Sequence, residues 1–411
     1  MRPPARTPAS AAVVTVGTEL VSGVAVDTNT AEIALALAGA QVEVCEAVSI
    51  GDDIGLLADT LRRLVASWDL IVVTGGLGPT HDDITRQAAC EALDVPCSRD
   101  ETVVERLRAS VFRHIDARAR EQLLVQADIL QGARVIAAVK GTAPGQIVPT
   151  ERGSLVLLPG PPREMRPMLR SLVAELAGDA PEPYVVRTSG MAESDVQLVA
   201  SDVLDDRPDI RLTVLAKLGD VRVILFGRGA TVSDLREAGE AIASRLGDSV
   251  YSTDGATLPE TVLALARARG ATIALAESCT GGLVAGALTD VPGASDVFIG
   301  GVVSYADSFK SAALGVPEDV LARSGAVSEE VARAMAEGVG RLSGATFACA
   351  ITGIAGPGGG SPEKPVGTVW FGLLTPSGTT AFKRSFAGDR DAVRERSTVT
   401  ALDTLRRALV P

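Results

Sequence analysis

Ala271–Leu288 reads ATIALAESCTGGLVAGAL: an apolar run to Leu275, a turn at 276–282 and a helix-like run from Leu283. This order predicts a strand, a tight turn and a helix, the repeating unit of α/β folds. Ser278 lies in the turn, where a helix N-terminus offers free N–H groups to negative charge. The Ser278 hydroxyl therefore fits two roles, a nucleophile or a cap for the helix.

A serine nucleophile needs a base, and the usual base, histidine, is missing from this part of the sequence. The two histidines, His81 and His114, both lie in the first third of the chain. Lysine can lose a proton where arginine cannot. Lys310 is the favoured base because it begins a helix-like run after the strand-like segment 297–304. The alternative is an ordinary surface lysine.

Six short motifs follow one another over the C-terminal region. They are AESCTGG (276–282), SY (304–305) with Lys310 after it, GAVS (325–328), TGIAGP (352–357), KPVGTV (364–369) and GDR (388–390). In this order they resemble the CinA C-terminal domain, a family of nicotinamide mononucleotide deamidases.

The resemblance implies a serine–lysine dyad at Ser278 and Lys310, with an active-site tyrosine at Tyr305 and a substrate-contacting arginine at Arg390. It implies no cofactor for the deamidase. The remaining predicted substrate-binding residues come from the turn after the first strand and from the 352–356 loop: Glu277, Cys279, Thr280, Gly281, Gly282, Thr352, Gly353, Ile354, Ala355 and Gly356.

The expected reaction begins with attack of Ser278 on the carboxamide carbon while neutral Lys310, oriented by Tyr305, takes the proton. Backbone N–H groups near Ser278 and residues 352–353 are expected to stabilise the oxyanion. The Arg390 guanidinium matches the 5′-phosphate. Its alternative role is an ion pair with a neighbouring aspartate, and Cys279 is interpreted as a small packing residue rather than a nucleophile.

A second glycine-rich turn lies near the N-terminus. Buried strands are predicted at Val13–Val16 and Leu70–Val73, and the second leads into TGGLGPTHDDIT at 74–85. Such a loop can hold phosphates with its N–H groups, although glycines also serve tight turns. Asp82 and Asp83 then point to a divalent cation between carboxylates and phosphate, or to capping of the next helix.

Together with GTAPG (141–145) and LPGPP (158–162), this loop resembles the molybdopterin-binding-like front domain of CinA proteins. The resemblance implies metal-dependent ADP-ribose pyrophosphatase activity, with Asp82 and Asp83 as metal ligands. The site residues predicted for this domain are Glu19, Asn29, Gly75, Gly76, Gly78, Thr80, Asp82 and Asp83.

The predicted fold class is α/β, with two three-layer domains of mostly parallel sheets joined by a small α+β middle domain. Their limits are expected at 1–175, 183–250 and 255–411, with a linker at Ala177–Pro183. The middle domain shows a β-α-β-β-α pattern that resembles a KH-type module. It lacks the GxxG loop that clamps nucleic acid, so a structural or dimer-forming role is favoured.

Composition agrees with a cytoplasmic enzyme that acts on small nucleotides. A net charge of −12 argues against a nucleic-acid surface. Five cysteines without CxxC spacing fit a reducing compartment, and no apolar run is long enough for a membrane span. Met1–Ser10 is interpreted as a disordered leader. The expected partners are nicotinamide mononucleotide, ADP-ribose and a second copy of the chain.

Two other functions stay open at this stage. The first is a non-catalytic nucleotide-binding regulator linked to competence, and the second is a molybdopterin-processing protein centred on the front domain. Intact Ser278 and Lys310 argue against the first. Binding of molybdopterin or of ADP-ribose would discriminate the second.

Overall fold

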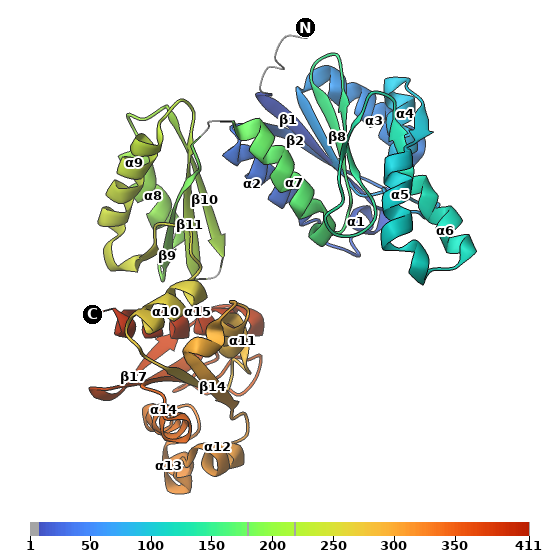
Figure 1. The fold of residues 1–411 in the computed structure, drawn as a ribbon. Helices are drawn as coiled ribbons and strands as arrows, with labels where there is room; N and C mark the ends of the chain where they lie inside the picture. Colours follow the sequence, from blue (N-terminus) through green and yellow to red (C-terminus); the bar gives the residue numbers. More distant parts are fainter. Residues whose placement is uncertain (1–7, 179–180, 218, 411) are drawn as a thin grey trace. The chain divides into compact units, whose positions relative to one another are not determined.

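The computed structural model describes residues 8–178, 181–217 and 219–410. The chain divides into two compact units, residues 1–182 and 183–411 (Figure 1). Most of the expected leader lies outside the described residues. Ser10, however, already begins strand β1, because the N–H groups of Ala9 and Ser10 donate to the Asp69 carboxylate. Part of the expected linker, residues 179–180, also lies outside the described residues.

The first unit is built on a six-stranded sheet of order β2-β1-β3-β8-β7-β6. The first four strands are parallel and the last two are antiparallel. The strands are β1 (Ser10–Val16), β2 (Glu43–Ile50), β3 (Leu70–Thr74), β6 (Arg134–Ile136), β7 (Gly145–Pro149) and β8 (Ser154–Leu158).

Both faces of this sheet are covered, which explains the continuous apolar runs of its central strands. Successive residues of β1 alternate between two cores: Val14 packs with α3 and α4, and Val13 packs with α2 and α7 (Figure 1). The helices of this unit are α1 (Thr18–Val21), α2 (Asn29–Gly39), α3 (Ile54–Ser67), α4 (Thr85–Leu93), α5 (Glu101–Ser110), α6 (Ala117–Leu123) and α7 (Pro162–Ala177), and a separate strand pair joins β4 (Cys97–Arg99) to β5 (Asp128–Leu130).

The second unit begins with a four-stranded antiparallel sheet of order β10-β11-β9-β12. Its elements are β9 (Tyr184–Ser189), α8 (Glu193–Val203), β10 (Ile210–Lys217), β11 (Asp220–Gly227), α9 (Val232–Leu246) and β12 (Val250–Ser252). The five elements predicted from the sequence are present, but β12 pairs with β9 and completes a split β-α-β arrangement. The small α+β middle domain is present, with β12 as one strand more than the predicted pattern, and its KH-type resemblance stays a prediction.

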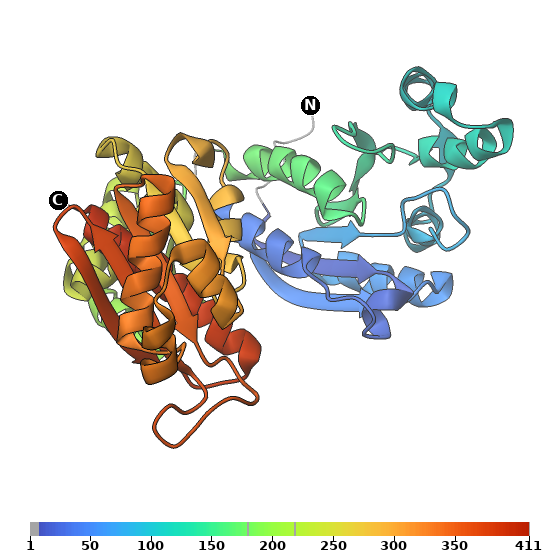
Figure 2. The same ribbon diagram turned by 90° about the horizontal axis from the view of Figure 1, so that it is seen from below.

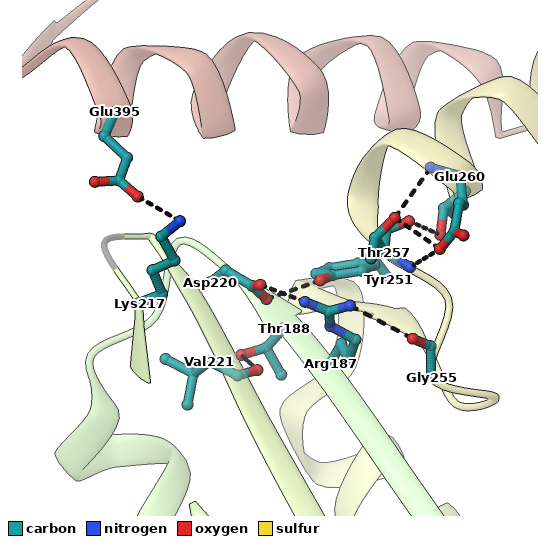
Figure 3. Close-up of polar contacts among 11 residues, drawn as sticks. Arg187, Thr188, Lys217, Asp220, Val221, Tyr251, Gly255, Thr257, Glu260 and Glu395 are labelled. Carbon is teal, nitrogen blue, oxygen red and sulfur yellow. Dashed lines mark hydrogen bonds and ion pairs between the residues drawn. The ribbon is translucent and has the colours of Figure 1, made fainter. Parts of the chain in front are cut away.

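A polar cluster ties this small sheet to the start of the C-terminal segment (Figure 3). Asp220 accepts from Arg187 Nη2 at 2.6 Å and from the Tyr251 hydroxyl at 2.7 Å. Arg187 also donates to the carbonyl of Gly255. The buried guanidinium thus pairs with a partly buried carboxylate where the chain leaves the sheet, while Arg187 Nε has no partner among the described residues.

The C-terminal segment forms a five-stranded sheet of order β14-β13-β15-β16-β17. The strands are β13 (Ile273–Glu277), β14 (Phe298–Val303), β15 (Phe347–Gly353), β16 (Thr368–Thr375) and β17 (Gly378–Ser385). The pairings of β14, β13 and β15 are parallel, and those of β15, β16 and β17 are antiparallel. The α/β class is confirmed, but this sheet is mixed rather than mostly parallel, because β15 to β17 form a meander.

Helices cover both faces of this sheet, and Figure 2 shows the segment from below. Leu275 packs toward α10, α11 and α15, whereas Ala274 and Ala276 pack toward α12 and α14. The helices are α10 (Leu258–Ala268), α11 (Leu283–Thr289), α12 (Asp307–Leu314), α13 (Glu318–Ser324), α14 (Glu329–Ser343) and α15 (Arg390–Leu409). No helix within residues 8–178, 181–217 and 219–410 is long and apolar enough to cross a bilayer.

Candidate active site

Three loops converge at the carboxyl edge of the parallel strands in the C-terminal sheet, the usual place for a ligand site in such sheets. Ser278 follows β13, and its N–H donates to the carbonyl of Ile351 on β15. Ser304 follows β14, and its N–H donates to the carbonyl of Glu277. The backbone therefore sets Ser278 between Ser304 and Thr352 along one edge of the sheet.

The turn that carries Ser278 depends on two glycines. Gly281 and Gly282 have φ angles of 63° and 99°, in the left-handed region that side chains disfavour. The chain turns sharply enough for the Gly281 N–H to donate to the Ser278 carbonyl. Ser278 is 7% exposed. It does not cap α11, whose N-cap residue is Gly282 without a side-chain bond, so the capping alternative for Ser278 is wrong.

Glu277 supplies the helix cap from a buried position. Its two carboxylate oxygens accept from the N–H groups of Gly282, Val284 and Ala285 at 2.8–3.2 Å. Three charge-assisted bonds compensate the burial of this carboxylate. The structure thus uses Glu277 to fix the turn and the start of α11, where the sequence suggested a substrate contact.

The N–H groups at the first turn of α11 are consequently occupied by Glu277. Among the described residues, the N–H groups of Cys279 and Thr280 donate to no backbone carbonyl. Both face the Cys279 sulfur, which is a weak acceptor. They are the main-chain donors that the turn leaves for a developing oxyanion beside Ser278.

Lys310 is a buried lysine and only 1% exposed, so its interpretation as a surface residue is wrong. It lies in the first turn of α12, and its Nζ donates to the carbonyl of Tyr305 at 3.1 Å and to Asp307 Oδ1 at 3.2 Å. The main chain of Tyr305 therefore orients Lys310, not its phenol as expected. No hydrogen bond joins Ser278 to Lys310 in the part of the chain that the structure describes.

Tyr305 and Arg390 form the outer rim of the site. The Tyr305 side chain is 61% exposed, and its hydroxyl accepts from Arg390 Nη2 at 2.9 Å. Arg390 Nη1 donates to the carbonyl of Gly356 at 2.7 Å. The alternative expected for Arg390 was an ion pair with a neighbouring aspartate. Asp391 instead pairs with Arg394, at 3.8 Å. Arg390 thus links the loops that follow β14 and β15.

Sequence reasoning missed Arg394 and Asp307. Arg394 lies one turn after Arg390 on α15 and donates to the carbonyls of Cys279 and Thr280 at 3.2 and 3.1 Å. The spacing of four residues from Arg390 was the available signal, because residues i and i+4 share a helix face. Asp307, three residues before Lys310, could have been found in the same way.

The 352–356 loop closes the site from the third strand. Thr352 is buried, and its hydroxyl donates to the carbonyl of Ala326 at 2.7 Å. A side chain at Gly353 would meet the Cys279 sulfur and Val369, so only glycine fits beneath the Ser278 turn. The Ile354 N–H donates to the carbonyl of Thr368, and Ala355 joins the core.

Burial raises the pKa of the Cys279 thiol to about 11. Cys279 is therefore a neutral thiol at physiological pH and lacks the thiolate character of a nucleophile. Its packing against the core agrees with the structural interpretation made from the sequence.

The glycine-rich loop at 74–85 in the first unit forms hydrogen bonds with its own Asp83 carboxylate. Asp83 Oδ1 accepts from the Gly78 N–H at 2.6 Å, and Asp83 Oδ2 accepts from the N–H and the hydroxyl of Thr80 at 2.7 and 2.5 Å. Gly75 and Gly76 have positive φ and pack against Val16 and Thr85, so they serve the turn. Helix α4 begins after Ile84 without a side-chain cap, so Asp82 and Asp83 do not cap it.

The remaining residues predicted for this site lie at the same edge of the sheet. Asn29 donates to the Thr74 hydroxyl and to the Gly160 carbonyl, while its buried Oδ1 has no partner. Glu19 is exposed beside Gly17. Arg86, which sequence reasoning missed, is buried and donates to the carbonyls of Leu77 and Gly78.

These donors do not fit a metal site as they stand. Both Asp83 oxygens already accept bonds from the loop, and the Asp82 carboxylate also accepts from the Thr80 side chain, which lowers the pKa of Asp82. Within the described ranges, no group of three or more His, Cys, Asp or Glu side chains could hold a metal ion. The predicted divalent metal stays a prediction.

Comparison with known proteins assigns a family model to each end of the chain. Residues 255–409 match the CinA C-terminal domain, and residues 12–178 match a "Probable molybdopterin binding domain". The chain is thus a multidomain α/β protein with a molybdopterin-binding-like front domain and a CinA C-terminal domain.

Whole-length relatives agree with these models. A CinA-like protein of Geobacter metallireducens is 40% identical over 97% of this chain and 99% of its own length. A CinA-like protein of Thermotoga maritima is 35% identical over 97% and 98%. The crystal structure of competence/damage inducible protein CihA from Agrobacterium tumefaciens is 42% identical, covers 38% of this chain and 94% of that chain, and has a TM-score of 0.36. The chain belongs to the CinA family.

Proposed function

We propose that the C-terminal domain hydrolyses nicotinamide mononucleotide to nicotinate mononucleotide and ammonia. The observation that carries the proposal is the buried Lys310 at the sheet edge that also presents Ser278. A lysine is almost never fully buried without a role or a full set of partners. Lys310 Nζ has two acceptors within the described chain, so the neutral amine, with two N–H bonds and one lone pair, keeps its lone pair for a proton from a reacting group.

In the proposed reaction, the Ser278 oxygen attacks the carboxamide carbon and neutral Lys310 accepts its proton. The N–H groups of Cys279 and Thr280 stabilise the oxyanion, each worth about 3 kcal/mol in comparable enzymes. The pyridinium charge of the substrate makes its carboxamide carbon more electrophilic. Lys310 returns the proton to the departing ammonia, and water then releases nicotinate mononucleotide from the acyl-enzyme.

Arg390 and Tyr305 are the proposed contacts of the 5′-phosphate. They lie at the exposed rim of the site, and Arg390 presents a planar fork that matches phosphate oxygens. Glu277 and Arg394 position the nucleophile. The Glu277 carboxylate accepts from the Gly282 N–H, and the Arg394 guanidinium donates to the Cys279 carbonyl. A homodimer in the cytoplasm is the assembly and location we expect.

Metal-dependent ADP-ribose cleavage in the front domain stays a prediction from family resemblance. The occupied oxygens of Asp83 do not support it, whereas the unpartnered Oδ1 of Asn29 supports binding of some polar ligand at that edge. The two rival functions, a regulator with an inactive amidase site and a molybdopterin-processing protein, differ from the proposal in one observable. Neither of them releases ammonia from nicotinamide mononucleotide.

The test is an assay of the full-length protein with nicotinamide mononucleotide, in which ammonia and nicotinate mononucleotide are quantified together. Equal amounts of both products are expected. Nicotinamide riboside, which lacks the phosphate, should react with a higher KM because Arg390 loses its partner. Absence of both products from folded protein would contradict the proposed function.

A further inference from the structure

Buried hydroxyl groups without hydrogen-bond partners gather around Ser278 and Lys310. Within the part of residues 255–411 that the structure describes, three side chains have a buried polar atom without a partner: Thr280, Ser304 and Ser311. Buried hydroxyls are nearly always bonded, so such groups call for a missing partner or a functional reason. All three lie on the Ser278 turn or on the segment that leads from β14 into α12.

Ser304 is the best placed of the three. It is 0% exposed, and its N–H donates at 2.8 Å to the carbonyl of Glu277, the residue before Ser278. Val303 pairs with Glu277 in the parallel register, so Ser304 and Ser278 stand level on adjacent strands. Adjacent strands lie about 4.8 Å apart, so the two serines are direct neighbours across the strand pair.

The other neighbour of Ser304 is the amine. Lys310 Nζ is anchored at 3.1 Å on the carbonyl of Tyr305, the residue that follows Ser304 in the chain. Ser304 is therefore next to Ser278 across the strand pair and next in sequence to the residue that anchors the amine. A serine hydroxyl offers one donor and two acceptor positions, and at Ser304 all of them are unassigned within the described chain.

We infer that Ser304 relays the proton between Ser278 and Lys310, so that the catalytic unit is Ser278–Ser304–Lys310 rather than a dyad. This inference rests on the proposed deamidase function. In the described structure Lys310 is bonded to Tyr305 and Asp307, and Ser304 has no partner, so the relay requires the three groups to close on one another when substrate binds.

As the Ser278 oxygen bonds to the carboxamide carbon, its proton passes to Ser304 Oγ, and the proton of Ser304 passes to the lone pair of neutral Lys310 Nζ. When the tetrahedral intermediate collapses, the ammonium of Lys310 returns a proton to Ser304 Oγ. Ser304 then gives a proton to the departing nitrogen, the C–N bond breaks, and ammonia leaves.

The test is the substitution Ser304→Ala in the full-length protein, assayed with nicotinamide mononucleotide beside the wild type. Loss of a proton relay should lower kcat by about 100-fold or more and leave KM within a few-fold. The melting temperature should stay the same or rise, because the removed hydroxyl has no partner in the described structure. Ser304→Cys, which keeps a proton-bearing group of similar size, should retain more activity than Ser304→Ala.

A matched control removes another unpartnered hydroxyl close by. Ser311→Ala, next to Lys310 on α12, should leave kcat unchanged. The rate in mixtures of H2O and D2O gives a second readout: two protons in flight predict a curved dependence for the wild type, and Ser304→Ala should give a straight line.

The possible failures are distinguishable. If the wild type releases no ammonia, the proposed function fails. If the wild type is active and Ser304→Ala keeps its kcat within about threefold, or changes KM alone, the relay is overturned while the deamidase stands. A straight isotope dependence in the wild type would overturn it as well.

Discussion

The molecule contains two glycine-rich turns that follow buried parallel strands, and they are built from the same parts. In each turn, an arginine donates hydrogen bonds to two successive carbonyls: the buried Arg86 donates to Leu77 and Gly78, and the partly exposed Arg394 donates to Cys279 and Thr280. In each turn, a carboxylate accepts hydrogen bonds from main-chain N–H groups. The two turns differ in which N–H groups the carboxylate takes.

Asp83 binds the N–H groups of its own loop, at Gly78 and Thr80, so that loop consumes the donors that a phosphate would need. Glu277 binds the N–H groups of the helix that follows, beginning at Gly282, and leaves those of Cys279 and Thr280 without a carbonyl partner. The proposed chemistry needs main-chain donors that are not held by a strong acceptor. The C-terminal turn meets this requirement, because the Cys279 and Thr280 N–H groups face only the weakly accepting Cys279 sulfur.

The largest effect on activity is expected from a substitution in the C-terminal turn. Ser278→Ala should lower kcat for ammonia release by about 10⁴-fold, because loss of a covalent nucleophile removes the main route. Binding of nicotinamide mononucleotide should persist, which calorimetry can measure. Ser397→Ala is the control, since that buried hydroxyl on α15 bonds only to Val393 and should leave kcat unchanged. Near-normal turnover by Ser278→Ala would end the acyl-enzyme mechanism.

A smaller effect is expected in the N-terminal loop. Asp83→Ala should lower the free energy of unfolding of the first unit by about 1–3 kcal/mol, because three donors lose a charged acceptor. Asp82→Ala is the matched control and should be near neutral in stability, because Asp82 is exposed. Thermal unfolding of both variants gives the comparison.

The same variants address the predicted second activity. Ammonia release should be unaffected by Asp82→Ala combined with Asp83→Ala, whereas metal-dependent ADP-ribose cleavage, where present, should disappear. If ammonia release fell together with ADP-ribose cleavage in folded protein, the two sites would not be separate.

The smallest effect concerns the thiol of the C-terminal turn. Because burial raises the pKa of Cys279 to about 11, the thiol stays protonated at pH 8 and should resist iodoacetamide in the folded protein. Cys45 is exposed and should be alkylated under the same conditions. Peptide mass spectrometry after alkylation distinguishes the two. Rapid labelling of Cys279 at pH 8 would return this residue to the list of nucleophiles.

Much of the C-terminal fold was predictable because periodicity and turns agreed along the chain. The apolar runs of the sequence predict strands near Thr272, Val302, Cys349, Val369 and Ala381, and these strands are present as β13 to β17. Helix α10 was missed although Thr257 and Glu260 form a capping box, a signal that can be read from the sequence. The mixed sheet could not be predicted, because strand direction depends on long-range pairing.

The placement of the candidate site residues was predictable from the sequence, whereas their contacts were not. Motif order placed Ser278, Lys310 and Arg390 at one sheet edge, and the structure brings their segments together. The bonding of Glu277 to the helix and of Asp83 to its own loop could not be read from residue type, because either carboxylate also suits a ligand. The sequence could not show whether Lys310 is buried or on the surface, because a single lysine forms no periodic pattern. The structure shows that it is buried.

The central claim is that Lys310 acts as a general base for the serine, and comparison of Lys310→Arg with Lys310→Ala at saturating substrate tests it most directly. Arginine keeps the positive charge but stays protonated at any working pH, so it cannot accept the proton. The account predicts that both variants lose kcat by a similar factor, about 100-fold or more. An arginine variant that keeps most of the wild-type kcat would contradict it and assign Lys310 to binding.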